Sequence, residues 1–214
     1  MLLIVIGALV ALSVVIAALV IFTSGGNPAR KPEAAAEVRL GEQAVIVGRD
    51  GAGTEVVVYE DFASPESREL AIASRDFLEI EAARGSVEVE YRPVAFEDDA
   101  YSRDAITALA GVLRTGTPAQ GLSFHDLLFD RQPDPGSDVM PEFRDWARDD
   151  GIDDTDVLEA VDADDAEFVA KANQAAADAG VNRIPTVLVD GEPLTAGSPT
   201  ALADKLQRLL LSRD

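Results

Sequence analysis

The residues best suited to chemistry are two serines, three positions apart, where a predicted strand gives way to a predicted helix. Residues 61–70 read DFASPESREL, so Ser64 and Ser67 fall in the first turn of that helix. Free backbone N–H groups and the helix dipole favour anions and nucleophiles at such a place. A serine hydroxyl there could attack an acyl or phosphoryl group if a base lay nearby. His125 is the only histidine in the chain.

Composition limits the other chemistries. The chain of 214 residues has no cysteine, which excludes disulfides, thiolate metal sites and thiol nucleophiles. A single histidine also excludes a multi-histidine zinc site, and we expect neither metal nor cofactor. With 39 acidic against 18 basic residues the formal net charge is −21, which argues against a nucleic-acid partner.

The start of the chain has the composition of a membrane anchor. Residues 2–22 contain no charged residue and, as a helix, would span ~30 Å of hydrocarbon. No Lys or Arg precedes them, so they predict a retained transmembrane anchor rather than a cleaved signal peptide. Residues 23–37 are rich in Gly, Pro and Ala and predict a flexible linker before a folded domain at 38–214. Arg30 and Lys31 follow the span and weakly favour a cytoplasmic domain.

The serines need a strand before them and a helix after them. Strands are predicted at 44–48 and 54–60, with an Asp-Gly turn between them. Ser64 is a good N-cap and Pro65 suits the next position, so a helix is predicted from Ser64 to about residue 83. The alternating segment 86–94 completes a βαβ unit, which implies a parallel pair of strands.

A helical block follows this unit. Gly- and Pro-containing breaks divide it into helices predicted at 101–113, 122–129, 142–148, 156–161 and 165–178. A hairpin around Asp190-Gly191 is predicted at 186–194, and Ser198 with Pro199 starts a last helix. The fold class is therefore α/β, with a helical insertion at about 99–180.

Three local sequences carry a resemblance to a known family. They are DFASPES at 61–67, FHDLLFDRQP at 124–133 and AGVNRIPTVLVDGEPL at 179–194. In this order they resemble thioredoxin-fold disulfide oxidoreductases of the DsbA type, whose Asp-Phe-x-Cys-Pro-x-Cys motif would here have both cysteines replaced by serine. The resemblance implies a thioredoxin-like fold, a cis Ile184-Pro185 bond facing the active-site helix, and an extracytoplasmic domain.

The same resemblance implies that redox chemistry is lost. Disulfide exchange needs an attacking thiolate and a second thiol that resolves the mixed disulfide, and a serine hydroxyl can supply neither. Ser64, Pro65, Glu66 and Ser67 would thus form a degenerate redox motif. In the family the backbone before the cis proline pairs with an extended peptide. The expected binding groove therefore comprises Phe62, Ser64, Ser67, Ile184, Pro185 and Thr186.

These readings lead to one leading hypothesis and two alternatives. The first is a single-pass cell-membrane protein with no redox activity, whose extracytoplasmic domain binds extended or unfolded polypeptide. The second is a serine-based hydrolase or transferase that reuses Ser64 and Ser67, although His125 is expected at a helix surface or beneath the insertion rather than in catalysis. The third is an architectural subunit bound to a membrane-protein partner.

Overall fold

The domain is built on a six-stranded mixed sheet with the strand order β1-β2-β4-β3-β5-β6. A computed structural model describes residues 35–96, 99–135, 137 and 141–213. The parallel pair β3 and β4 lies at the centre, and every other neighbouring pair is antiparallel. The strands are β1 (Val38–Leu40), β2 (Val45–Val47), β3 (Thr54–Glu60), β4 (Val87–Pro93), β5 (Thr186–Val189) and β6 (Glu192–Leu194).

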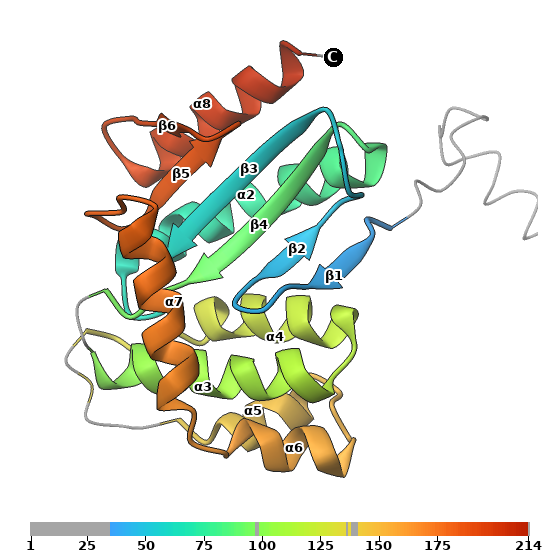
Figure 1. Cartoon of the computed structure of the whole chain (residues 1–214), viewed down its shortest axis with the longest axis vertical. Helices are drawn as coiled ribbons and strands as arrows, with labels where there is room; N and C mark the ends of the chain where they lie inside the picture. The colour runs from blue at the N-terminus through green and yellow to red at the C-terminus, as the bar shows by residue number, and fades with distance from the viewer. Residues whose placement is uncertain (1–34, 97–98, 136, 138–140, 214) are drawn as a thin grey trace, which may run out of the picture. The chain divides into compact units, whose positions relative to one another are not determined.

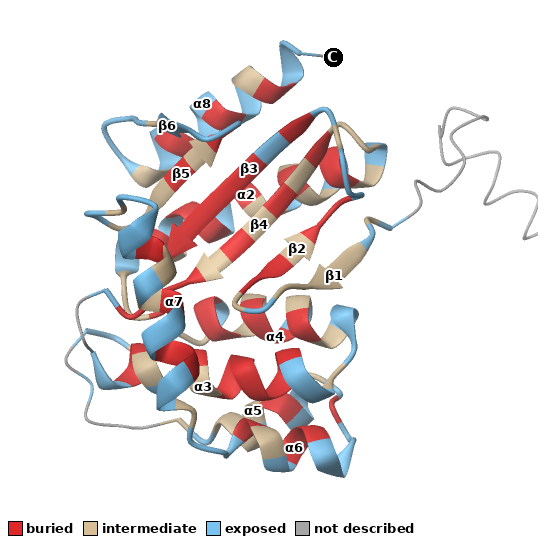
Figure 2. Cartoon of the chain, viewed as in Figure 1, coloured by how far each residue is buried: buried red, intermediate tan, exposed pale blue. Residues whose placement is uncertain are grey.

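Strand β3 is buried along nearly its whole length because both faces of the sheet are covered (Figure 2). Val56 and Val58 belong to the main core, whereas Val57 and Tyr59 pack in a second cluster with Ala176. A strand covered on both faces reads as a continuous apolar run, and TEVVVYE has that composition. Its carboxyl end leads directly into the serine-bearing turn.

Seven helices of the described chain surround this sheet. In the view of Figure 1, α3 to α6 are grouped below the sheet and α8 lies above it. Helix α2, which carries the serines, packs against α8. The helices are α2 (Pro65–Arg84), α3 (Ala100–Thr115), α4 (Pro118–Asp130), α5 (Phe143–Asp149), α6 (Thr155–Val161), α7 (Ala166–Asp178) and α8 (Pro199–Leu211).

Most predicted elements are confirmed within two residues at their ends. The βαβ unit is β3-α2-β4, and the hairpin turns at Asp190 and Gly191, both of which have positive φ. Helix α4 begins at Pro118, four residues before its predicted start, because Thr117 and Gln120 form a capping box. Strand β1 was not predicted.

The predicted anchor at 2–22 lies outside the described residues, as does most of the predicted linker. Within the described residues, no helix combines the length and apolar character that crossing a membrane requires. The Gly48 N–H donates to the Glu37 carbonyl at 2.7 Å beside β1. The first described strand, β1, begins at Val38.

Candidate functional site

The serine-bearing turn is a capped helix start in which both hydroxyls are engaged. Ser64 is the N-cap of α2, and its Oγ accepts a hydrogen bond from the Ser67 N–H at 3.1 Å. The Ser64 hydroxyl lies 3.4 Å from a Glu66 carboxylate oxygen, to which it donates. Ser67 is buried, and its Oγ accepts the Asp61 N–H at 3.2 Å. The predicted cap is confirmed, and the two serines have structural partners.

Asp61 joins this turn to the loop that follows β4. Its buried carboxylate accepts the Ala63 N–H at 2.8 Å with one oxygen and the Phe96 N–H at 2.8 Å with the other. A carboxylate that accepts backbone N–H bonds on both oxygens fixes the separation of the two segments. Asp61 was part of the quoted motif, yet the sequence alone gave it no role.

The helical insertion holds the turn from the other side. The Gln132 side-chain amide donates to the carbonyls of Phe62 at 2.6 Å and Ser64 at 3.0 Å. In return, the Arg68 guanidinium of α2 donates to the Phe129 carbonyl at 2.8 Å. Gln132 lies in the segment that resembles the family, but only the folded structure shows what it contacts.

Phe62 does not line a groove, which corrects the sequence-based assignment. Its side chain is 0% exposed because the strand end turns it into the core. There its ring contacts Phe129 with centroids 4.8 Å apart and His125 with centroids 5.7 Å apart. Phe62 therefore supports the turn from beneath, and no side-chain surface is left for a ligand.

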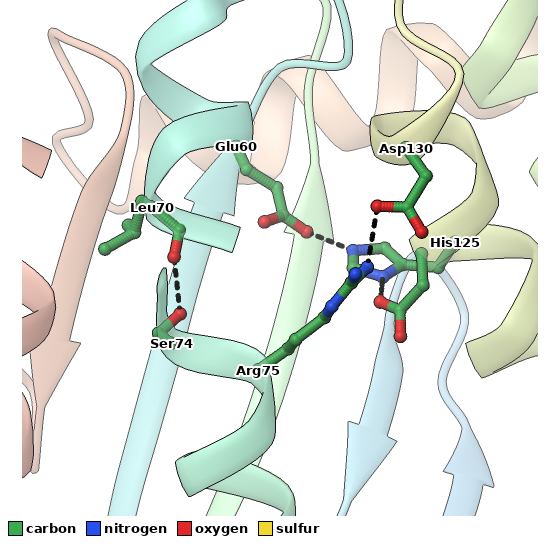
Figure 3. Close-up of polar contacts among 7 residues, drawn as sticks. Glu60, Leu70, Ser74, Arg75, His125 and Asp130 are labelled. Carbon is green, nitrogen blue, oxygen red and sulfur yellow. Dashed lines mark hydrogen bonds and ion pairs between the residues drawn. The ribbon is translucent and has the colours of Figure 1, made fainter. Parts of the chain in front are cut away.

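Beneath the turn lies a buried pair of ionisable groups, Glu60 and His125. Figure 3 shows the Glu60 carboxylate at the end of β3 directed at the imidazole, with Oε1 2.5 Å from Nε2. The other ring nitrogen, Nδ1, lies 2.9 Å from Asp126 Oδ1. Both nitrogens thus face carboxylates, which suits an imidazolium that donates on each side. Of the two expected places for His125, the interior is correct and the helix surface is wrong.

Burial and the neighbouring charges shift the pKa values of Glu60 and His125 in opposite directions. Burial lowers the His125 pKa, but the carboxylates of Glu60 and Asp126 outweigh it and raise that pKa to about 10. Burial raises the pKa of Glu60, and the nearby imidazole reduces this shift. Burial and the charge of Asp126 also raise the pKa of Glu79. The imidazolium is thus the charged form that this site stabilises.

A serine hydrolase would need a free base near Ser64, and the structure offers none from histidine. His125 is the only histidine of the chain, is 1% exposed, and has both nitrogens facing carboxylates. General-base catalysis requires a nitrogen that can take the nucleophile's proton. The geometry does not favour the hydrolase alternative.

The Ile184-Pro185 loop lies at the same end of the sheet as the serines. Its peptide bond is cis, as the resemblance implied. Thr186 pairs with Tyr59 in antiparallel register, so the residues before Thr186 continue past the end of β3 towards the turn. Ile184, Pro185 and Thr186 are half-buried, and Ile184 packs against the cluster of Tyr59 and Val94. The loop and the turn flank the same strand end.

A cavity of about 490 Å³ lies beside Pro65, on the face of α2 that meets the start of α8. Ile72 in its lining is 44% exposed, although it is a large apolar side chain. The Thr200 hydroxyl donates to the Glu69 carboxylate at the junction of the two helices. The lining residues are Pro65, Arg68, Glu69, Ile72, Ala73 and Thr200.

No metal centre accompanies the site. Over the part of the chain that the structure describes, no three His, Cys, Asp or Glu side chains are grouped so that they could hold a metal ion.

Comparison with known proteins links this architecture to a family. A family model described as thioredoxin matches residues 41–208. The fold is similar to MdbA, a thiol-disulfide oxidoreductase from Corynebacterium matruchotii, with a TM-score of 0.67 and 20% identity over 80% of this chain and 91% of that one. DsbA from Mycobacterium tuberculosis has a TM-score of 0.62 and 24% identity over 82% and 92% of the two chains. BdbD from Bacillus subtilis gives 0.64 and 22% over 78% and 92%.

The comparison with curated proteins found no match. The structural likenesses are below 25% identity and describe the fold. The family-model match covers most of the chain, including both serines and the Ile184-Pro185 loop.

Proposed function

The chain belongs to the thioredoxin family, and from that premise we propose that it is a membrane-anchored protein without redox activity that binds extended or unfolded polypeptide. The observation that carries the proposal is that the site lacks sulfur but keeps the fold of the family. Oxygen stands at both positions where the family motif has sulfur, while the fold around them remains. A scaffold that keeps a cis-proline loop beside a capped helix start can still present a backbone edge to a peptide.

The loss of redox chemistry follows from the side chains. Neither serine can form a mixed disulfide, and the whole chain contains no thiol that could replace them. The Ser67 hydroxyl is also buried against the Asp61 N–H. MdbA is a thiol-disulfide oxidoreductase, whereas this chain could take part in such a reaction only through a partner's cysteines.

Two surfaces beside the turn support polypeptide binding. The half-buried loop at Ile184 and Pro185 leads into β5 past the end of β3, and an extended chain could form hydrogen bonds with the backbone of this loop. The cavity beside Pro65 has Ile72 and Ala73 in its lining, which suits an apolar side chain of the same segment. A peptide that crossed the turn would contact both.

The membrane part of the proposal rests on the sequence. Residues 2–22 have the length and composition of an anchor, and the resemblance favours an extracytoplasmic domain. Protease treatment of intact cells tests the location, because an extracytoplasmic domain is digested without lysis. Protection until lysis would place the domain in the cytoplasm, as the positions of Arg30 and Lys31 weakly suggest.

Peptide binding is testable with the full-length protein in detergent. We expect a short fluorescein-labelled unstructured peptide with an apolar centre to bind with saturable anisotropy. Ile72→Glu should weaken binding about tenfold, since it places a charge in the cavity lining. Ile80→Glu is the matched control, because Ile80 is equally exposed at 45% and does not line that cavity.

The same preparation distinguishes the alternatives. Insulin reduction should remain at background, and robust turnover would contradict the loss of redox activity. Labelling by a fluorophosphonate that Ser64→Ala abolishes would favour the hydrolase. Absence of peptide binding, together with co-purification of a fixed partner that does not depend on the Pro185 loop, would favour the architectural subunit.

A further inference from the structure

Phe96 is an exposed aromatic side chain beside the serine-bearing turn. Four large apolar side chains of the described residues are exposed, and Phe96, at 44%, is the aromatic one among them. It follows β4 in the loop that leads to α3. Folding leaves nearly half of this side chain in water, so part of its apolar area does not contribute to the hydrophobic stabilisation of the domain.

The backbone that carries Phe96 is firmly held. The Val94 N–H donates to the Glu60 carbonyl at 2.8 Å, and the Ser102 hydroxyl donates to the Val94 carbonyl at 3.4 Å. The Asn173 amide then bonds both the N–H of Ala95, at 2.9 Å, and its carbonyl, at 3.3 Å. These contacts come from β3, α3 and α7. An exposed ring on an ordered backbone loses little entropy on binding.

Asp61 ties Phe96 to the turn itself. The same carboxylate accepts the Phe96 N–H and the Ala63 N–H, each at 2.8 Å. Strand β3 lies between β4 and β5, so the loops after β4 and before β5 flank the turn on its two sides. Phe96 therefore stands on one flank and the Ile184-Pro185 loop on the other.

We propose that Phe96 is a fixed aromatic anchor for the bound polypeptide, and that the segment it takes combines an apolar residue with basic neighbours. This inference rests on the proposed function and specifies its ligand. Aromatic rings at protein interfaces contribute a large apolar area at low conformational cost. A ring held beside a peptide-binding edge is placed to cover an apolar side chain of the peptide.

Charge complementarity identifies the rest of the ligand. The chain carries a formal net charge of −21. Glu66 and Glu69 are exposed beside Pro65, and the guanidinium of Arg68 is already bonded to the Phe129 carbonyl. A negatively charged surface raises the association rate of basic segments and repels acidic ones. Lysine or arginine flanking the apolar residue thus fits this surface.

The test uses the full-length protein in detergent and three labelled peptides. The first has an apolar centre with lysine flanks, the second the same centre with glutamate flanks, and the third a serine centre with lysine flanks. Anisotropy titrations compare wild type with Phe96→Ser, Phe96→Leu and Ile80→Ser. Ile80 is the matched control because it is 45% exposed and lies ~22 Å along α2 from Pro65 at about 1.5 Å per residue.

We expect the first peptide to bind wild type most tightly and increasing salt to weaken its binding. Phe96→Ser should raise its Kd about tenfold, Phe96→Leu by about threefold or less, and Ile80→Ser not at all. Binding to wild type that is unaffected by Phe96→Ser, or equal for lysine and glutamate flanks, would overturn this inference and leave the proposed function standing. Failure of wild type to bind any of the three peptides would overturn both.

Discussion

The serine-bearing turn and the Ile184-Pro185 loop are held in different ways. The turn at residues 61–67 is fixed by the Gln132 side chain, which donates to two of its carbonyls, and by the burial of its own Phe62 in the core. The loop at Ile184 and Pro185 is half-buried, and the Thr186 hydroxyl bonds locally to the Arg183 carbonyl. The turn is integrated into the core, whereas the loop remains available at the surface.

This difference shows that the shape of the turn does not require sulfur. The groups that shape the turn are Asp61, Gln132 and the Glu60–His125 pair, and none of them depends on a sulfur atom. Replacing cysteine by serine leaves every one of these contacts possible. The four changes below test whether the turn is as rigid as the contrast implies, from the largest expected effect to the smallest.

Restoring the sulfurs is the most direct test of the turn. We expect the double variant Ser64→Cys/Ser67→Cys to gain dithiol-disulfide exchange from a background of zero, because the start of α2 lowers the pKa of a thiol at residue 64. Insulin reduction and thiol titration before and after oxidation measure the gain. Ser67→Cys alone is the control and should show no internal disulfide. A double variant that cannot form one would mean that the turn no longer has the redox geometry.

Breaking the buried ion pair should cost the most stability. His125→Leu leaves the Glu60 carboxylate buried without its partner, so we expect the free energy of unfolding to fall by about 3–5 kcal/mol in urea denaturation. Arg148→Ala breaks an exposed pair with Asp145 and should cost about 1 kcal/mol or less. Adding Glu60→Leu to His125→Leu should recover much of the loss. Equal effects of His125→Leu and Arg148→Ala would show that the pair does not hold the turn.

The pair also predicts a dependence of stability on pH. The His125 pKa rises from 6.5 to about 10 on folding, so the native state holds this proton more tightly than the unfolded chain. The contribution of the His125 proton to the free energy of unfolding is complete below pH 6.5 and is lost as the pH rises through about 10. The raised pKa of Glu60 acts in the same sense from 4.5 upward. Urea denaturation at intervals across this range should show wild type losing stability with rising pH, and His125→Leu losing less. Parallel curves for the two proteins would contradict the assignment.

Removing the clamp, the pair of hydrogen bonds from the Gln132 side chain to the turn, should have the smallest effect of the four. Gln132→Leu takes the donor from the Phe62 and Ser64 carbonyls, and we expect a loss of about 1–3 kcal/mol, with faster amide exchange at residues 62–67. Gln174→Leu is the matched control, since Gln174 donates to Asp178 at an exposed site. Unchanged exchange in the Gln132 variant would show that the turn is held without the insertion.

Local chemistry explains what the sequence could predict. Ser64 with Pro65 marks a helix start, and Asp190-Gly191 marks a hairpin, whatever the rest of the chain does. The capping box of Thr117 and Gln120 was also visible in the sequence. Residues 115–118 were interpreted only as one of the Gly- and Pro-containing breaks, so α4 was predicted too short. Strand β1 has three residues, and its pairing with β2 rather than its composition makes it a strand.

The parts of the site that were not predicted depend on contacts between distant segments. Glu60 at the end of an apolar strand and His125 within an apolar helix were each a visible irregularity. Nothing local indicated that the two would meet, since 65 positions separate them. The clamp from Gln132 spans a similar separation. Phe62 was misassigned because a position next to a functional motif does not determine which way a side chain points.

The carboxylate of Asp61 has a consequence for selectivity. Because it bonds to backbone on both sides, it sets the interval between the backbone of Phe96 and the start of α2. A bound extended peptide that crossed this end of the sheet would contact Phe96 and the start of α2 with residues separated by a fixed number of positions. Ligands would then be sorted by the spacing of their side chains rather than by a particular amino acid at one place.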